Sequence, residues 1–177
     1  QSAGGPHRDV DGPQADRTGV AGGTAVERGS TGGEGEFHQG GRSAGGHLAA
    51  MLAVTTKDDG LEGSGGHDDQ SSAVQAAVAV CARLNLEAPL SLTIQGDDPV
   101  VVRFLGGPLA EKREAARRAS PIAYVKSSTP PIYLLHGAAD KRVHTGQATA
   151  MAETLAKAGV PHEIVLVEGG IHGMGIA

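Results

Sequence analysis

Three residues that can act together as nucleophile, base and acid lie in Gly-containing segments of the chain. Ser43 is the central residue of Gly41-Arg-Ser-Ala-Gly45, Asp140 ends His-Gly-Ala-Ala-Asp, and His172 lies in Gly-Gly-Ile-His-Gly. A serine hydroxyl is a poor nucleophile until a neutral imidazole takes its proton. The imidazole in turn needs a carboxylate, which fixes its tautomer and stabilises the imidazolium that forms. The three segments therefore contain the residue types of a serine-hydrolase triad.

The order and surroundings of these residues carry more information than the serine motif alone. Gly-x-Ser-x-Gly is a weak signal in a chain with 28 Gly, because a Gly-rich turn with an ordinary serine has the same pattern. Asp140, however, lies just beyond the apolar run that ends at Gly137, and His172 lies just beyond the run that ends at Val167. The order Ser, Asp, His is that of the α/β-hydrolases and differs from the orders of the chymotrypsin and subtilisin folds.

Runs of apolar and helix-forming residues predict the elements that position these side chains. Short apolar runs predict strands, and the first of them, rich in Val, is expected to be buried on both faces. The predicted strands are Ala73–Cys81, Pro131–Gly137 and His162–Val167, and the predicted helices are Gly45–Thr55, Leu109–Ala119 and Gly146–Ala158. Residues 57–72 are polar and Gly-rich and predict a loop, whereas residues 97–109 indicate no single element.

This alternation of strands and helices indicates parallel βαβ units. In sheets of that kind, ligands bind beyond the carboxyl ends of the strands. The rule points to three places: the turn around Ser43, the segment after Gly137 and the segment after Val167. Each of them holds one of the three residues that could do chemistry.

Longer segments around these residues resemble one family. Ser43-Ala-Gly-Gly-His-Leu-Ala-Ala is similar to the nucleophile elbow of bacterial α/β-hydrolase esterases, nearest to the feruloyl and acetyl esterase branch beside the hormone-sensitive-lipase-like enzymes. Ala119-Ser-Pro-Ile-Ala-Tyr-Val and Pro130-Pro-Ile-Tyr-Leu-Leu-His-Gly-Ala-Ala-Asp resemble the family segment that leads to the acid, and Gly170-Ile-His-Gly resembles its histidine loop. The resemblance covers residues 43–175 nearly continuously, with its motifs in order.

The resemblance implies an α/β fold, the C-terminal half of an α/β-hydrolase sheet with parallel strands and flanking helices. It implies Ser43 as the nucleophile, Asp140 as the acid and His172 as the base. The backbone N–H of Ala44 would be one donor of the oxyanion hole. A mechanism of this kind requires no cofactor and no metal, and none is predicted.

Other polar residues have plainer interpretations. We expect His136, at the end of a predicted strand, to be packed or hydrogen-bonded, and His47 to lie at the surface or behind the site. Cys81 is expected to be a small buried side chain. The cluster Gly66-His-Asp-Asp69 is interpreted as a solvated loop, although its composition also suits a metal. The arginines of the predicted helix 109–119 are expected to form a solvated face.

The first 42 residues differ in composition from the rest of the chain. They include 12 Gly and only eight residues of the hydrophobic set, with no Leu, Ile or Met. A segment so poor in apolar side chains cannot offset the entropy of ordering its backbone. We therefore predict that residues 1–42 are an irregular, Gly-rich, non-core leader, either a flexible tail or a non-native segment, and that residues 43–177 are a partial α/β-hydrolase domain.

The leader departs from the family pattern in two ways. Residues 33–42, which precede the serine, do not read as the buried strand that a nucleophile elbow requires. The start of the chain also does not match the His-Gly-Gly loop from which the family takes its second oxyanion donor. We expect a shifted reading frame or a mispredicted gene start to explain both departures, so that the native upstream strands would be encoded in another frame.

Three functions follow from these observations. The first is a serine hydrolase that cleaves small-molecule carboxylic esters through an acyl-enzyme. The second is a catalytically silent fragment of such an esterase, and the third is a peptidase of the prolyl-oligopeptidase type, which shares the triad order. A net charge of −5 with no basic stripe argues against nucleic acid as a partner, and no apolar run is long enough for a membrane span. The pattern indicates no oligomeric state.

Overall fold

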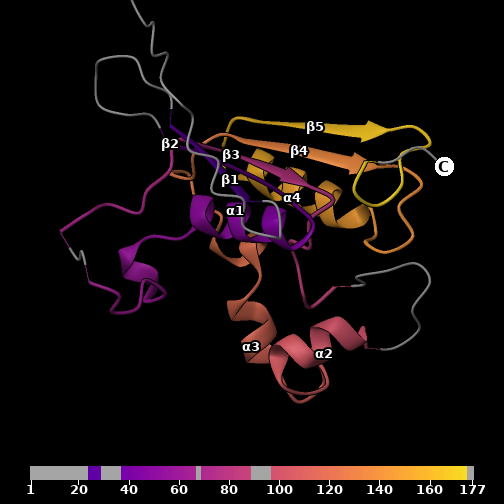
Figure 1. Ribbon diagram of the computed structural model, residues 1–177, viewed down its shortest axis with the longest axis horizontal. Coiled ribbons are helices and arrows are strands. Elements are labelled where there is room, and N and C mark those ends of the chain that lie inside the picture. The colour runs from indigo at the N-terminus through magenta and orange to yellow at the C-terminus, as the bar shows by residue number, and fades with distance from the viewer. Residues whose placement is uncertain (1–23, 29–36, 67–68, 89–96, 175–177) are drawn as a thin grey trace, which may run out of the picture.

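The computed structural model describes residues 24–28, 37–66, 69–88 and 97–174. These residues form a five-stranded sheet with the strand order β1-β2-β3-β4-β5 (Figure 1). The strands are β1 (Thr24–Arg28), β2 (Phe37–Arg42), β3 (Ala76–Val80), β4 (Ile132–Gly137) and β5 (His162–Val167). β2 to β5 are parallel, and β1 pairs antiparallel with β2. The predicted α/β class with a parallel sheet is confirmed.

Two helices connect parallel strands and pack on the sheet. α1 (Ala44–Val54) follows β2 directly, and its buried residues are all Gly, Ala or Val, so its axis lies close to β2 and β3. α4 (Gly146–Lys157) connects β4 to β5 and buries Met151 and Leu155, one turn apart on the same face. Both helices lie within one residue of their predicted bounds at each end. No helix in the described ranges is long and apolar enough to cross a membrane.

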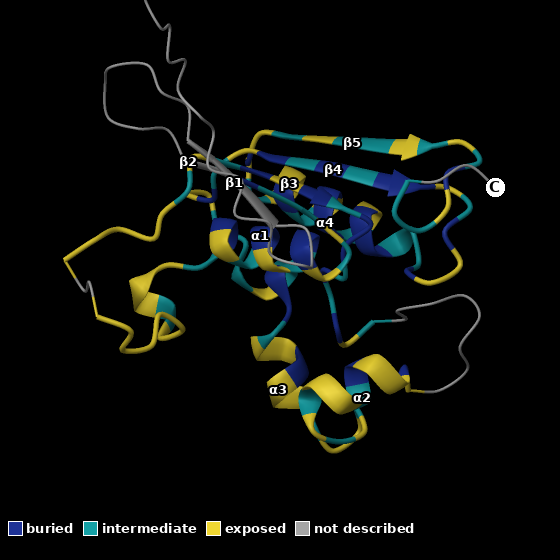
Figure 2. Ribbon diagram, viewed as in Figure 1, coloured by how far each residue is buried: buried dark blue, intermediate teal, exposed yellow. Residues whose placement is uncertain are grey.

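The main core lies between these two helices and one face of the sheet. It contains Ala50 and Val54 of α1, Ile132 and Leu134 of β4, and Leu155 of α4, together with Ala77 and Ala79 of β3, and all are buried. The opposite face is less covered, since Val78 is 39% exposed. The prediction that this strand is buried on both faces was wrong, because α1 and α4 cover the same face (Figure 2).

The segment between β3 and β4 forms a small lobe below the sheet in Figure 1. α2 (Pro99–Leu105) begins at Asp98, whose side chain accepts the N–H of Val100, and a proline follows at the first helical position. α3 (Arg113–Arg118) is shorter than predicted, because residues 109–112 form turns on the carbonyl of Pro108. Short 3-10 helices, η1 (Lys57–Asp59) and η2 (Pro121–Tyr124), lie in the loops before β3 and before β4.

The strand β2 corrects the prediction for the residues that precede the serine. Residues 37–42 were expected to be irregular, yet they pair with β3 from His38 opposite Ala76 to Arg42 opposite Val80. Gln39 of this strand is buried. β2 is a strand because its neighbours supply backbone partners on both sides, not because its own residues are apolar. The predictions for residues 1–23 and 29–36 concern residues outside those that the structure describes.

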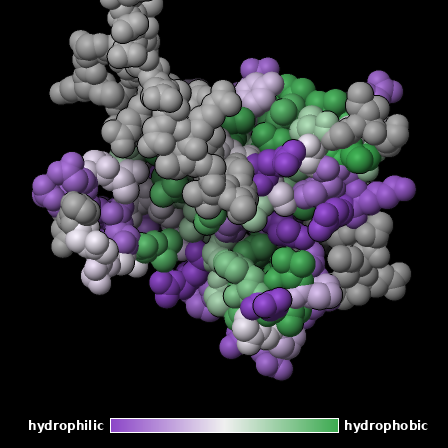
Figure 3. All heavy atoms as spheres, in the orientation of Figure 1, coloured by the Kyte–Doolittle hydropathy of each residue, from purple (hydrophilic) through white to green (hydrophobic). Residues whose placement is uncertain are grey.

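Hydrophobic side chains also reach the surface on several elements, among them β5 and α2 (Figure 3). Leu166 on β5 is 48% exposed, and Phe104 on α2 is 63% exposed. The residues singled out by the sequence lie at the carboxyl ends of β2, β4 and β5.

Candidate active site

The nucleophile candidate lies in a sharp turn between a strand and a helix. β2 ends at Arg42, Ser43 has φ 55° and ψ −117°, and α1 begins at Ala44. A positive φ at a residue other than Gly is strained and persists only where the surroundings impose it. Here the N–H of Ser43 donates to the carbonyl of Val80 at 2.8 Å, and its carbonyl accepts the N–H of His47 at 3.0 Å. The turn therefore holds the serine at the mouth of the sheet.

Gly41 is needed because this turn is tight. A Cβ on Gly41 would collide with the carbonyl group of Gly45, in the first turn of α1. The strand and the helix approach each other so closely that there is no space for a side chain between them. This contact is the steric requirement that the Gly-x-Ser-x-Gly pattern predicts.

The acid candidate lies in the turn after β4. Asp140 is buried, and its Oδ1 accepts the backbone N–H groups of Arg142 at 2.8 Å and Val143 at 3.0 Å. Burial alone would raise the pKa of Asp140. The hydrogen bonds from Val143, His172 and Arg142 outweigh burial and hold the pKa of Asp140 below its ordinary value. The carboxyl group is therefore ionised at neutral pH.

The base candidate links the other two. His172 follows β5, and its Nδ1 lies 2.8 Å from Oδ2 of Asp140 while its Nε2 lies 3.0 Å from Oγ of Ser43. Because an ionised carboxylate only accepts, Nδ1 carries the proton and donates to Asp140. Nε2 is then free to accept the hydroxyl proton of Ser43. The structure thus brings together all three residues that the sequence singled out.

Contacts between loops hold this arrangement. Ala138 and Ala139, in the turn before the acid, donate their N–H groups at 2.8 Å to the carbonyls of Val167 and Gly170, in the segment before the base. The guanidinium of Arg42 donates to the carbonyl of Gly173 at 3.2 Å. The loop that carries His172 is therefore bonded to the acid loop on one side and to the end of β2 on the other.

Ala44 lies where the sequence places it, immediately after the serine at the amino end of α1. The first N–H groups of a helix have no acceptor within the helix. The backbone N–H of Ala44 is therefore positioned to donate to an oxygen on which negative charge develops.

The remaining candidates lie as follows. His47 is partly buried, and its Nδ1 lies 2.7 Å from the carbonyl of Arg83, behind the site. Burial lowers the pKa of His47 below its ordinary value. Cys81 is fully buried, as expected. Residues 67 and 68, part of the polar loop cluster, lie outside the described residues.

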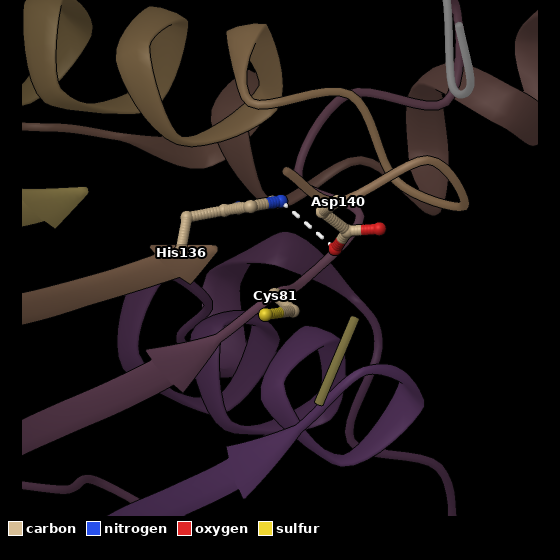
Figure 4. A group of neighbouring side chains, drawn as sticks. All are labelled: Cys81, His136 and Asp140. Atoms are coloured by element: carbon tan, nitrogen blue, oxygen red, sulfur yellow. Dashed lines mark ion pairs between the residues drawn. The ribbon is translucent and has the colours of Figure 1, made fainter. Parts of the chain in front are cut away.

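One contact with the triad was missed by the sequence interpretation. Cys81, His136 and Asp140 lie together at the ends of β3 and β4, with potential ligand atoms within 4.8 Å of one another (Figure 4). His136 is buried and hydrogen-bonded, as expected, but its Nε2 also lies 3.3 Å from Oδ2 of Asp140. The sequence did contain a sign of this contact, because His136 lies near the end of β4, four residues before Asp140.

Known proteins match the part of the chain that carries the site. The sequence profile of the BD-FAE family matches residues 35–155. The esterase LipQ of Mycobacterium tuberculosis is 34% identical over 122 residues, which are 67% of this chain and 28% of LipQ.

Solved structures resemble the fold over a similar stretch. A truncated carbohydrate esterase from gut microbiota is 29% identical with a TM-score of 0.68, over 76% of this chain and 52% of that one. A propionate-bound thermophilic esterase from the planctomycete Thermogutta terrifontis is 31% identical with a TM-score of 0.57, over 77% of this chain and 46% of that one. The chain thus spans about half or less of the length of these relatives.

Proposed function

The chain belongs to the BD-FAE family of α/β-hydrolase esterases, and we propose that it hydrolyses carboxylic esters through an acyl-enzyme on Ser43. One observation carries the proposal: the unbroken connection from Oγ of Ser43 through the ring of His172 to the carboxylate of Asp140, at 3.0 and 2.8 Å. Both distances lie within the reach of a nucleophile-base pair and of a base with its orienting acid.

In the acylation step, Oγ of Ser43 attacks the ester carbonyl carbon while Nε2 of His172 takes the hydroxyl proton. The imidazolium that forms is stabilised by Asp140, which stays ionised. The same proton then passes to the alcohol oxygen as the carbon–oxygen bond of the ester breaks, and the acyl group stays on Ser43. In deacylation, His172 takes a proton from water, the hydroxide attacks the acyl carbon, and Ser43 regains its proton as the acid leaves.

The tetrahedral intermediates place a negative charge on the former carbonyl oxygen. The backbone N–H of Ala44 would donate to this oxygen, since it lies at the amino end of α1 and directly after the nucleophile. The partial positive charge of a helix amino end favours an anion at this position. Removing one oxyanion donor in a hydrolase typically lowers the rate about 100- to 1,000-fold.

The substrate that we propose is a small-molecule carboxylic ester. The Thermogutta esterase is described with propionate bound, and the gut relative is described as a carbohydrate esterase. Both descriptions concern those proteins, and we extend to this chain only what they share with its site, which is cleavage of an ester. Neither description favours the peptidase alternative.

The test uses the purified chain and chromogenic esters of acetate, propionate and butyrate. We expect steady hydrolysis that falls to background in Ser43→Ala. Ser127→Ala is the matched control, because Ser127 is exposed and lies before β4, at the end of the sheet opposite the triad. Its rate should equal that of the unmodified chain.

Two results would overturn the proposal. Hydrolysis of a peptide anilide faster than of the esters would favour the peptidase. Absence of Ser43-dependent turnover from a chain that melts cooperatively would favour the catalytically silent alternative.

A further inference from the structure

His136 makes a contact that the mechanism above does not use. It lies in β4, four residues before Asp140, and is fully buried. Its Nε2 lies 3.1 Å from the carbonyl oxygen of Val143 and 3.3 Å from Oδ2 of Asp140, whereas its Nδ1 has no hydrogen-bond partner among the residues that the structure describes. Figure 4 shows the ring extending from the end of β4 toward the Asp140 carboxylate.

These contacts determine the tautomer of the ring. A carbonyl and an ionised carboxylate both only accept hydrogen bonds, so Nε2 of His136 carries the proton and donates. Nδ1 then holds a lone pair. Burial lowers the pKa of His136 below its ordinary value, so the ring is neutral at neutral pH. A neutral ring that donates through Nε2 does not bind a metal ion through that atom.

The Nε2–H of His136 adds a fourth donor to the acid. Oδ1 of Asp140 accepts from the N–H groups of Arg142 and Val143, and Oδ2 accepts from His172 at 2.8 Å. His136 approaches the same oxygen as His172 does. It also binds the carbonyl of Val143, whose N–H binds the other oxygen of Asp140. Contacts to both carboxylate oxygens of Asp140 therefore hold the turn from residue 140 to residue 143 in place.

We propose that His136 is a positioning residue for the triad, whose Nε2–H orients the Asp140 carboxylate toward His172 and competes with His172 for Oδ2. This inference rests on the proposed function. By sharing the negative charge, His136 limits how strongly Asp140 stabilises the protonated form of His172. A base that is protonated less readily stays neutral, and therefore active, to a lower pH.

Two other ionisable groups near Asp140 and His172 come from neighbouring strands. Cys81 lies at the end of β3 within the same cluster. Arg42 lies at the end of β2, with its guanidinium on the carbonyl of Gly173, one residue after the base. Neither is altered by a substitution at His136, so a changed NMR signal of the His172 ring reports the contact at Asp140.

The test compares His136→Leu, which removes the donor, with His136→Gln, which retains an N–H near the position of Nε2. We expect His136→Leu to lower kcat about tenfold, with KM little changed, and to move the acidic limb of the kcat/KM profile up by about half a pH unit. His136→Gln should recover most of the rate and return the limb toward its original position. Loss of packing alone would impair both variants alike and leave the limb unmoved.

A second measurement does not depend on turnover. The 1H NMR signal of the Nδ1 proton of His172, which donates to Asp140, should shift in His136→Leu and lie close to its original position in His136→Gln. If the chain does not hydrolyse esters but this shift is found, the proposed function fails and the positioning inference stands. If ester hydrolysis depends on Ser43 but no shift is found, the inference is wrong. Should His136→Leu not fold, the same NMR signal is measured in His136→Met.

Discussion

Gly137 and Gly170 pack backbone against backbone, with no space for a side chain on Gly137. A Cβ on Gly137 would collide with the carbonyl group of Gly170, and a Cβ on Gly170 would lie 3.0 Å from the Cα of Gly137. Gly137 ends the strand that leads to Asp140, and Gly170 lies two residues before His172. The distance between the acid and the base is therefore set by a contact between two glycines.

Gly137→Ala should separate these loops. The added methyl group must displace either β4 or the segment before His172, because its neighbours are backbone atoms and not flexible side chains. We expect a loss of about 1–3 kcal/mol in the free energy of unfolding, from overpacking. Ester hydrolysis should fall about 100-fold, since a displacement of the order of 1 Å at a reacting pair has that effect. Denaturant unfolding and steady-state rates measure the two effects.

Gly65→Ala is the control for that substitution. A Cβ on Gly65, in the loop before β3, would meet no atom of the described residues within 4 Å, so its change should leave stability and rate unaltered. A Gly137→Ala variant as active as Gly65→Ala would show that the glycine contact does not set the geometry of the site.

Asp140 should make stability depend on pH. Its pKa is lower in the folded protein than in the unfolded chain, so its ionised form stabilises the fold at pH values above the unfolded pKa. That contribution is lost as the pH falls through the lower, folded pKa. In Asp140→Asn this dependence is absent. Thermal denaturation between pH 6 and pH 3 should therefore show the Tm difference between the unmodified chain and Asp140→Asn shrinking as the pH falls.

Glu114→Gln is the control for this pH dependence of stability. The pKa of Glu114 is also lowered, by its hydrogen bonds with Arg117, but both side chains are exposed on α3. Exposed pairs contribute little to stability, so this variant should follow the unmodified chain at every pH. A Tm difference for Asp140→Asn that stays constant or grows on acidification would contradict the assignment of an ionised, stabilised carboxylate.

Gln147 of α4 should stabilise the whole fold, because its side chain binds the backbone of the segment that follows β3. This buried side chain accepts the N–H groups of Leu84 and Asn85 at 2.8 and 2.7 Å, and donates to the carbonyl of Asn85 at 3.0 Å. Gln147→Leu leaves these backbone groups buried without their partner. We expect a loss of about 2–4 kcal/mol in the free energy of unfolding, measured by urea denaturation. Gln70→Leu, at an exposed position, should change it little, and equal effects of the two would refute the role of the buried amide.

Most of the elements around the site were predictable because their patterns are local. The strand before Asp140 is an apolar run that starts after Pro131 and ends at Gly137, and the strand before His172 is a similar run. The helix after Ser43 consists largely of Ala and Leu. The positions of the three site residues after these strands follow from the rule for parallel sheets.

Other features depend on tertiary contacts that no local pattern records. Phe37–Arg42 contains three polar residues and two glycines, and it forms a strand because Ala76–Val80 pairs with it. Val78 is exposed because both packing helices lie on the other face. The contact of His136 with Asp140 depends on the curvature of the turn between them, which the spacing permits but does not require.

The most direct test of the account is covalent labelling of the purified chain with a fluorophosphonate, with the modified residue located by mass spectrometry. Such reagents modify a serine that a neighbouring imidazole activates. We predict one adduct, on Ser43, which is absent in Ser43→Ala, strongly reduced in His172→Ala and unchanged in Ser127→Ala. A folded chain that acquires no adduct on Ser43, or acquires it equally in His172→Ala, would contradict the claim that these residues form a working triad.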